Sequence, residues 1–342
     1  MNKIFSFLLV LAFIVSCGFD EAISDLLDDG ITSISIGISS DKVNANESVT
    51  FEAKDNNQNN ISSSSKFYVD GQLISGSTYS TASGGDHEVF ATYKTIVSDK
   101  KSFNVFVPPP TNFQSNVLIE DYTATWCGYC PRVLFGIEEL EKETDKISIV
   151  AVHADDQFHF PEVNSMMSTF DIRGFPTARL NRTITWVNPP YNSSQVVDMA
   201  TVPSNLGIAS TSSISGKTIT LKVKVKFGTD AYSDTKLIVL LLEDDLKADQ
   251  DNWTSYYDEV DPIPNFVHNN ILRVTLTSIY GDAIPNTKSK LGEMYTQDFT
   301  YEVPSGYNKS KLKIVAFVVG SNKKAINVRG TSIGINQNFE EL

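Results

Sequence analysis

Two cysteines separated by two residues constrain the fold of this chain more than any other feature. They are Cys127 and Cys130, which lie in the stretch EDYTATWCGYCPR at residues 120–132. The apolar run VLIEDY before them predicts a strand, and apolar residues recur at helical spacing after them. The pair is therefore expected where a strand passes into a helix, as a redox-active dithiol, a metal clip or a structural disulfide.

Strands and helices alternate over residues 116–202. The run KISIVAVHA at 146–154 predicts a buried strand because it is apolar almost throughout. The segments FPTARLN and TITWVN predict a hairpin, and SSQVVDMA predicts a terminal helix. One apolar face of a further helix is predicted by the spacing of Val163, Met166, Met167 and Phe170. This order of elements is typical of an α/β domain.

The segments on both sides are expected to be all-β. Residues 31–107 contain short alternating strands separated by polar turns, which is typical of a small immunoglobulin-like β-sandwich. Three prolines follow in the expected linker 108–115, and each fixes φ and lacks a backbone N–H. Residues 203–342 return to strands, including the strictly alternating run TITLKVKVKF, and predict a second sandwich. The predicted fold class is multidomain, with an α/β domain flanked by two immunoglobulin-like all-β domains.

The N-terminal residues predict export to a membrane. A short positive start and an apolar run predict a secretory signal peptide over residues 1–16. The run ends in IVSC, which resembles the lipobox of bacterial lipoproteins, so Cys17 is expected to carry lipid and residues 17–30 to form a tether. A transmembrane segment with an incidental cysteine is the alternative, but the run is shorter than the roughly 20 residues that spanning requires. The absence of aspartate after Cys17 favours the outer membrane, with the chain periplasmic or surface-exposed.

Charge limits the partners of the chain. The formal net charge of −13 argues against nucleic acid and against anionic lipid as partners, because both need basic surfaces. The segment 243–268 is acidic, aromatic and longer than a hairpin needs. A solvated loop is expected there rather than a calcium site, because the glycine-centred loop of an EF-hand is missing. The aspartates that calcium would use are Asp244, Asp245, Asp249 and Asp251.

A cysteine pair at a helix N-terminus has a physical logic as a redox centre. The helix dipole and the free N–H groups lower the pKa of Cys127 below the roughly 8.5 of a free thiol. Its thiolate can then attack a substrate disulfide, and Cys130 can resolve the mixed disulfide. Once Cys17 is assigned to the membrane, only this pair remains, and in an oxidising compartment the two cysteines can bond to each other.

The stretches EDYTATWCGYCP and IRGFPTARL resemble the active-site segment and the cis-proline loop of the thioredoxin superfamily. The resemblance implies a thioredoxin-like domain over residues 116–202, with Trp126 before the first cysteine. It also implies that Asp121 is a buried carboxylate that exchanges a proton with Cys130. Pro176 is expected to follow a cis peptide bond opposite the dithiol.

The same resemblance suggests how substrate is held. The backbone of Phe175 is expected to pair with an extended substrate segment, and Tyr129 is the second candidate for substrate binding. Thioredoxins have Gly-Pro between the cysteines, whereas this chain has Gly128 and Tyr129. The central dipeptide helps to set the reduction potential, so oxidation, reduction and isomerisation all stay open.

The whole order of segments is similar to that of the outer-membrane-protein-twenty-eight-related lipoproteins. The resemblance rests on the lipobox, on WCGYCPR and on the element VHNNILR, and it covers residues 117–342. His268 lies in the last element and is a site candidate, although a structural role is the simpler interpretation. The family implies a membrane-anchored, extracytoplasmic thiol–disulfide oxidoreductase that needs no cofactor and acts on protein thiols and disulfides of the cell envelope.

Two alternatives stay open. A zinc site would add His153 and His159 to the cysteines, because structural zinc takes four ligands. That site would leave Trp126, Asp121 and the Gly-Phe-Pro loop unexplained, so no metal is expected. In the other alternative, the chain is a surface binding or adhesion lipoprotein, with a structural disulfide on a thioredoxin scaffold.

Overall fold

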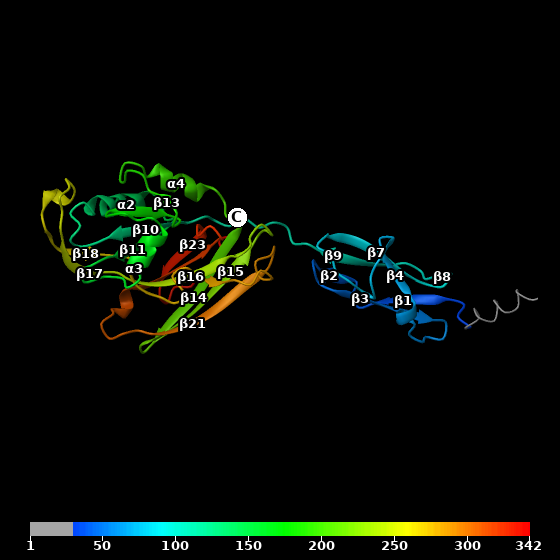
Figure 1. Cartoon of the computed structure of the whole chain (residues 1–342). Helices are drawn as coiled ribbons and strands as arrows, with labels where there is room; N and C mark the ends of the chain where they lie inside the picture. The colour runs from blue at the N-terminus through cyan, green and yellow to red at the C-terminus, as the bar shows by residue number, and fades with distance from the viewer. Residues whose placement is uncertain (1–29) are drawn as a thin grey trace, which may run out of the picture. The chain divides into compact units, whose positions relative to one another are not determined.

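The computed structural model describes residues 30–342, which form two compact units that divide between Val107 and Pro108 (Figure 1). The expected signal peptide and the tether up to residue 29, including the lipid-bearing Cys17, lie outside the described residues. Within residues 30–342, no helix is both long enough and apolar enough to cross a bilayer.

The first unit consists of two sheets around one core. The smaller sheet has the order β1 (Ile34–Ile38), β3 (Val49–Asp55) and β6 (Thr78–Tyr79). The larger has the order β2 (Lys42–Asn44), β9 (Lys101–Phe106), β7 (Gly85–Tyr93), β4 (Lys66–Val69) and β5 (Gln72–Leu73), with β8 (Ile96–Val97) beside β7. A short 3-10 helix covers Ser62–Ser64. Alternating apolar residues of both sheets meet in the core, where Phe51 of the smaller sheet contacts Phe67 and Phe103 of the larger.

A nine-stranded mixed sheet runs through the second unit. Its order is β13 (Ile184–Thr185), β12 (Thr177–Leu180), β10 (Val117–Thr123), β11 (Ile147–His153), β19 (Ile271–Thr275), β16 (Lys236–Glu243), β22 (Leu312–Val319) and β23 (Ala325–Ser332), with β20 (Asp282–Ala283) beside β16. The β10 and β11 strands are parallel, and β12 is antiparallel to β10. Buried residues fill β10 completely, as a strand covered on both faces requires.

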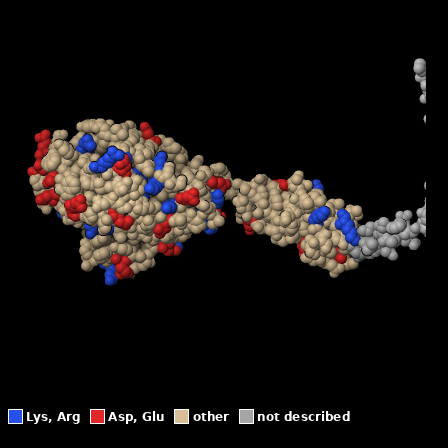
Figure 2. Space-filling view, in the orientation of Figure 1, with Lys and Arg blue, Asp and Glu red and all other residues tan. Residues whose placement is uncertain are grey.

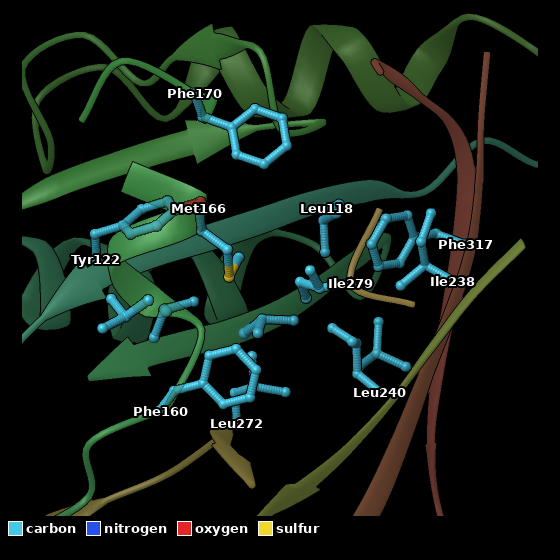
Figure 3. Close-up of a cluster of buried hydrophobic side chains, with 14 of the residues drawn as sticks. Leu118, Tyr122, Phe160, Met166, Phe170, Ile238, Leu240, Leu272, Ile279 and Phe317 are labelled. Carbon is cyan, nitrogen blue, oxygen red and sulfur yellow. The ribbon is translucent and has the colours of Figure 1, made fainter. Parts of the chain in front are cut away.

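Helices cover both faces of the first strands of this sheet. On one face lies α3 (Val163–Thr169), whose Val163 and Met166 pack against Leu118 and Tyr122 in the core drawn in Figure 3. On the other face, α2 (Pro131–Glu143) and α4 (Ser194–Thr201) share a core with Val117 and Ile119. The predicted order of strands and helices is confirmed in this segment.

A second layer packs on the far half of the large sheet. It is a three-stranded sheet of β14 (Leu206–Ser215), β15 (Thr218–Phe227) and β21 (Met294–Glu302). The predicted alternation along β15 is confirmed, because its apolar residues are buried against β16 and β22. A separate hairpin is formed by β17 (Leu246–Gln250) and β18 (Ile263–His268), and 3-10 turns cover Tyr257–Glu259 and Lys309–Lys311.

The large sheet crosses the domain boundary expected between residues 202 and 203. Ala151 of β11 pairs in parallel with Ile271 of β19, so one sheet joins the α/β segment to the strands that follow. Without β19, the backbone N–H and C=O groups on that side of β11 would have no hydrogen-bond partners, which gives a physical reason for the pairing. The chain is thus a mixed α/β protein with several β-sheets, in which residues 203–342 share a sheet with the α/β segment.

Candidate functional site

The two cysteines form a disulfide after β10, where α2 begins. The Cys130 N–H donates to the Cys127 carbonyl at 3.0 Å, and the Val133 N–H donates to the Cys130 carbonyl at 2.9 Å. Pro131 takes the first helical position, where the N–H that it lacks would have no acceptor within the helix. The sequence thus places both sulfur atoms at the N-terminal end of α2, where the helix dipole favours a thiolate.

Both cysteines of the pair are buried. Cys127 is only 5% exposed and Cys130 is 0% exposed. Both belong to a small apolar cluster with Ala124, and Phe175 packs against that cluster. Cys127 is the more accessible of the two cysteines, but the surface that it offers to a partner is small.

Asp121 lies on β10 beneath α2. Alternation along the strand puts its side chain on the same face as Val117 and Ile119, and its partners on the two neighbouring strands are Ala151 and Ala178. The carboxyl group is fully buried, and neither oxygen has a hydrogen-bond partner among the described residues. Burial raises the pKa of Asp121 from 3.8 to about 7. The group can therefore bind or release a proton near neutral pH.

The loop before β12 approaches the disulfide from another side. The peptide bond between Phe175 and Pro176 is cis, as the family resemblance implied. The Phe175 ring lies edge-on to Trp126, with the ring centroids 5.7 Å apart. Trp126 donates from Nε1 to the Ala154 carbonyl at 3.1 Å and remains 47% exposed. The structure therefore brings the predicted tryptophan, the cis-proline loop and the cysteine pair together.

The segment 250–261, between β17 and β18, packs against the cysteine loop, and we call it the strap. Gln250 is buried and donates from Nε2 to the carbonyls of Ala124 and Cys127 at 3.3 and 3.1 Å. The Asp251 N–H donates to the Thr125 carbonyl at 2.9 Å. The carbonyls of Ala124 and Cys127 also accept from the backbone N–H groups of Cys127 and Cys130, so Gln250 adds a second hydrogen bond to each of them.

Aromatic side chains complete the contact between the strap and the site. Trp253 lies edge-on to Tyr129, with the ring centroids 5.6 Å apart, and Tyr256 stacks on Phe135 of α2 at 4.6 Å. Tyr129 and Trp253 are 58% and 62% exposed, so both present apolar surface beside the disulfide. The sequence analysis identified this segment as unusually long and aromatic but did not place it at the cysteines.

Hydrogen bonds within the strap hold its conformation, and several of its acidic side chains are exposed. Asn252 is buried, and its Nδ2 donates to the carbonyls of Tyr256 and Val260 at 2.8 and 3.1 Å. Figure 2 shows acidic side chains at the end of the second unit where Figure 1 draws the strap. The exposed acidic residues of the strap are Asp258, Glu259 and Asp261.

Three of the four aspartates considered for calcium, Asp244, Asp245 and Asp249, bind other groups. Asp244 accepts from the Asn270 N–H at 2.7 Å and pairs with Lys313. Asp245 pairs with Lys311, and Asp249 accepts from the Asn265 N–H. The structure therefore uses these carboxylates to hold the β17–β18 hairpin and its connections.

His153 is the last residue of β11, and His268 is the last residue of β18. His153 Nδ1 lies 2.7 Å from Asp156 Oδ2, and the rings of His153 and His268 are 5.6 Å apart. Burial, together with the neighbouring His153, lowers the pKa of His268 to about 4. Burial alone would raise the pKa of Asp156, but its bonds to His153 and to the Thr125 N–H hold that pKa below its usual value.

The histidines of the zinc alternative do not join the cysteines. His153 is bonded to Asp156, and His159 Nδ1 accepts from the Asp155 N–H at 2.9 Å. Across residues 30–342, no group of three His, Cys, Asp or Glu side chains is arranged to hold a metal ion. Cys127 and Cys130 are bonded to each other instead.

Two protein families match this chain. The model of outer membrane protein Omp28 matches residues 163–337, and the thioredoxin model matches residues 94–188. Both resemblances drawn from the sequence are thereby confirmed, and the chain contains a thioredoxin-like domain with a Cys-x-x-Cys disulfide. No curated protein matches.

One solved structure shares the fold of this chain, and two others match it only weakly. HBP35 of Porphyromonas gingivalis matches with a TM-score of 0.52 and 21% identity, over 65% of this chain and 76% of that one. Domains 4–9 of the surface layer protein SbsC match with a TM-score of 0.18 and 10% identity, over 89% of this chain and 50% of that one. A β-glucosidase from Kluyveromyces marxianus in complex with glucose has a TM-score of 0.19 and 9% identity, over 90% of this chain and 43% of its own. Only the first of these likenesses bears on the fold.

Proposed function

The chain belongs to the Omp28 family of outer membrane proteins, and from this premise we propose that it is a membrane-anchored, extracytoplasmic thiol–disulfide oxidoreductase. The observation that carries the proposal is Asp121, a buried carboxyl group without a hydrogen-bond partner among the described residues, beneath the helix that begins at the disulfide. A scaffold with a purely structural disulfide has no use for such a group, because burying it without a partner is unfavourable.

The reaction begins with the reduced pair. The Cys127 thiolate attacks one sulfur of a substrate disulfide and forms a mixed disulfide, and the second substrate sulfur leaves as a thiolate that takes a proton. Asp121 then accepts the proton of the Cys130 thiol. The Cys130 thiolate attacks Cys127 Sγ, which restores the Cys127–Cys130 disulfide and releases the substrate as a dithiol. The same steps in reverse oxidise a substrate.

The surface around the disulfide supports a protein substrate. Trp126, Tyr129 and Trp253 are exposed aromatic residues beside it, and the Phe175 backbone can pair with an extended segment. Substrates that reach the site past the strap also meet exposed carboxylates. The substrates we propose are therefore protein thiols and disulfides of the cell envelope that offer extended segments.

The other parts of the chain fit an anchored enzyme. We propose that Cys17 carries the lipid that holds the protein at the outer membrane, with the chain periplasmic or surface-exposed. In this proposal, the first unit, residues 31–107, is an immunoglobulin-like spacer. Mass spectrometry of the N-terminal peptide would detect the lipid, and C17S should release the protein from membranes. Release of no protein by C17S would refute the anchor.

The proposal is tested by trapping. Cys130→Ala removes the resolving thiol, so mixed disulfides with clients should accumulate at Cys127 and be recovered from cell envelopes under non-reducing conditions. Cys127→Ala is the matched control and should trap none. Equilibration of the purified chain with glutathione buffers measures the potential of the pair. If C130A traps no partner and the pair exchanges with no disulfide, the redox function is refuted.

A second candidate function rests on the low exposure of Cys127. At 5%, this residue offers little surface to a partner, as expected of a structural disulfide in a binding or adhesion lipoprotein. That role predicts a pair whose potential lies below about −300 mV and that exchanges with no protein. The glutathione equilibration therefore separates the two candidates.

A further inference from the structure

A small cavity lies beneath α2, behind the disulfide. Its volume is about 60 Å³, and its walls come from β10, β11, α2, the end of β18 and the start of β19. The titratable residues that line it are Asp121, Glu138, Glu141, His153 and His268. Asp121 and His268 are buried, whereas Glu138 and Glu141 are exposed on α2, so the cavity connects the buried carboxyl to the surface of the helix.

Two buried polar groups in this cavity have no partner among the described residues. They are the carboxyl group of Asp121, with both oxygens, and Nε2 of His268, which is 3% exposed. Buried polar atoms are nearly always hydrogen-bonded, either to protein or to water. A water needs about 10–15 Å³ of such space and two to four polar partners, so the cavity has room for a few waters that join the two groups.

The surroundings of His268 make it an acceptor on the cavity side. Its other ring nitrogen donates to the Ala248 carbonyl, which fixes the tautomer and leaves a lone pair on Nε2. Its low pKa keeps the ring neutral at all but acidic pH. The His153 ring also lines the cavity and lies edge-on to His268, but its Nδ1 is engaged with Asp156, and His153 has no buried ring nitrogen without a partner.

We propose that His268 is a positioning residue for proton transfer: it holds water in this cavity against Asp121, and through that water Asp121 exchanges its proton with solvent at the α2 surface. This inference rests on the thiol–disulfide exchange proposed above. When Cys130 attacks, its thiol proton passes to Asp121. The protonated carboxyl then gives the proton to the adjacent water, and the exposed carboxylates of Glu138 and Glu141 receive it at the outer end. In the reverse reaction the proton returns by the same route.

The proposal gives the C-terminal part of the chain a role in the chemistry. His268 lies on β18, outside the thioredoxin match at residues 94–188 and inside the Omp28 match at residues 163–337. Ala151, which pairs with Asp121 across β10 and β11, also lines the cavity, and its small side chain leaves room for the water.

The test measures the resolving step alone. The full chain carrying C17S is prepared with a peptide disulfide-bonded to Cys127, and release of the peptide by Cys130 is followed over pH. His268→Phe keeps a ring but removes both nitrogens, so we expect release about tenfold slower, with a shifted pH midpoint. This is part of the about 10²–10⁴-fold in rate that a positioned proton transfer contributes, because Asp121 itself remains. His268→Gln keeps an acceptor and should restore most of the rate. When H268F is added to D121N, the rate of release should not fall further, because both substitutions act on the same proton route.

A second variant guards against a folding defect in H268F. Ala151→Val fills the cavity while His268 stays in place, and it should produce the same slow release and the same pH shift. Lys247→Ala, an exposed change on β17, is the control and should leave the release unchanged. A wild-type rate and midpoint in either H268F or A151V would overturn the proton route and leave the oxidoreductase standing. Failure of the wild-type chain to release peptide at all would instead refute the proposed function.

Discussion

The Trp253 indole lies directly against Gly128, the first of the two residues between the cysteines. The Trp253 N–H donates to the Gly128 carbonyl at 2.6 Å, and a Cβ built on Gly128 would lie 2.3 Å from Cδ2 of the indole. The active-site loop and the strap thus meet with no space for a side chain. This contact couples the thioredoxin-like segment to a loop that follows it by more than a hundred residues.

Gly128→Ala should displace the strap. The added methyl group overlaps the indole ring, and forcing extra atoms into a packed contact costs about 1–3 kcal/mol. We expect a lower free energy of unfolding in urea and a change in tryptophan fluorescence. Gly174→Ala is the matched control, because nothing lies within 4 Å of its Cβ position. Equal stability in the two variants would mean that the Trp253 contact contributes nothing.

Gln250→Ala should also weaken the contact between the strap and the active-site loop, because it removes buried hydrogen bonds. Its buried amide donates to the carbonyls of Ala124 and Cys127, and each hydrogen bond that is lost costs about 0.5–1.5 kcal/mol, because both carbonyls keep a backbone N–H as partner. Chemical denaturation of the oxidised protein measures the loss. Gln157→Ala, at an exposed position, should change the stability by no more than about 0.5 kcal/mol. If Gln250→Ala changes the stability no more than Gln157→Ala does, water replaces the Gln250 amide in the variant.

Local patterns in the sequence predicted the centre of the site. The helix after the cysteines, the buried strand before them and the loop at Pro176 each follow from short-range spacing or from a motif, and the structure contains all three. These features need only residues that are near one another in the chain.

The rest of the site depends on contacts between distant segments, which periodicity does not encode. The strand pairing of Ala151 with Ile271 joins two segments expected to be separate domains. Trp253 lies in a loop without periodicity and Gln250 ends the short strand β17, so nothing local assigned them to the cysteines. The burial of Arg182 was also missed, because arginine is almost never fully buried unless it is paired.

Arg182 and Glu120 form a buried ion pair that we expect to be costly to break. Nε of Arg182 lies 3.1 Å from Oε1 of Glu120, and the guanidinium packs over the rings of Phe170 and Phe317. Arg182→Met should lower the free energy of unfolding by about 3–5 kcal/mol, because it leaves an unpaired buried charge. The double variant with Glu120→Leu should recover much of this loss.

An exposed pair provides the control for that measurement. Arg173 and Asp171 are bonded at 2.9 Å but are both well exposed, so Arg173→Met should cost less than about 1 kcal/mol. A loss at Arg182 as small as that at Arg173 would contradict the prediction, as would a double variant less stable than R182M alone.

Asp121 should make the stability of the oxidised protein depend on pH. Its pKa is 3.8 in the unfolded chain and about 7 in the folded state, so between these values the folded state holds a proton that the unfolded chain releases. At this site the folded state binds more protons, so the contribution of Asp121 to stability falls as pH rises from about 4 to about 7. The difference of about three pKa units corresponds to a loss on the order of 4 kcal/mol. Asp121→Asn cannot ionise, so it lacks this contribution, whereas other groups, such as His268 with its pKa of about 4, titrate in both proteins. The stability of the wild type minus that of D121N should therefore fall across this window and be lowest at pH 8. Urea denaturation of both disulfide-bonded proteins at pH 4, 6 and 8 measures the two curves, and parallel curves would show that Asp121 is already ionised in the folded state at pH 4.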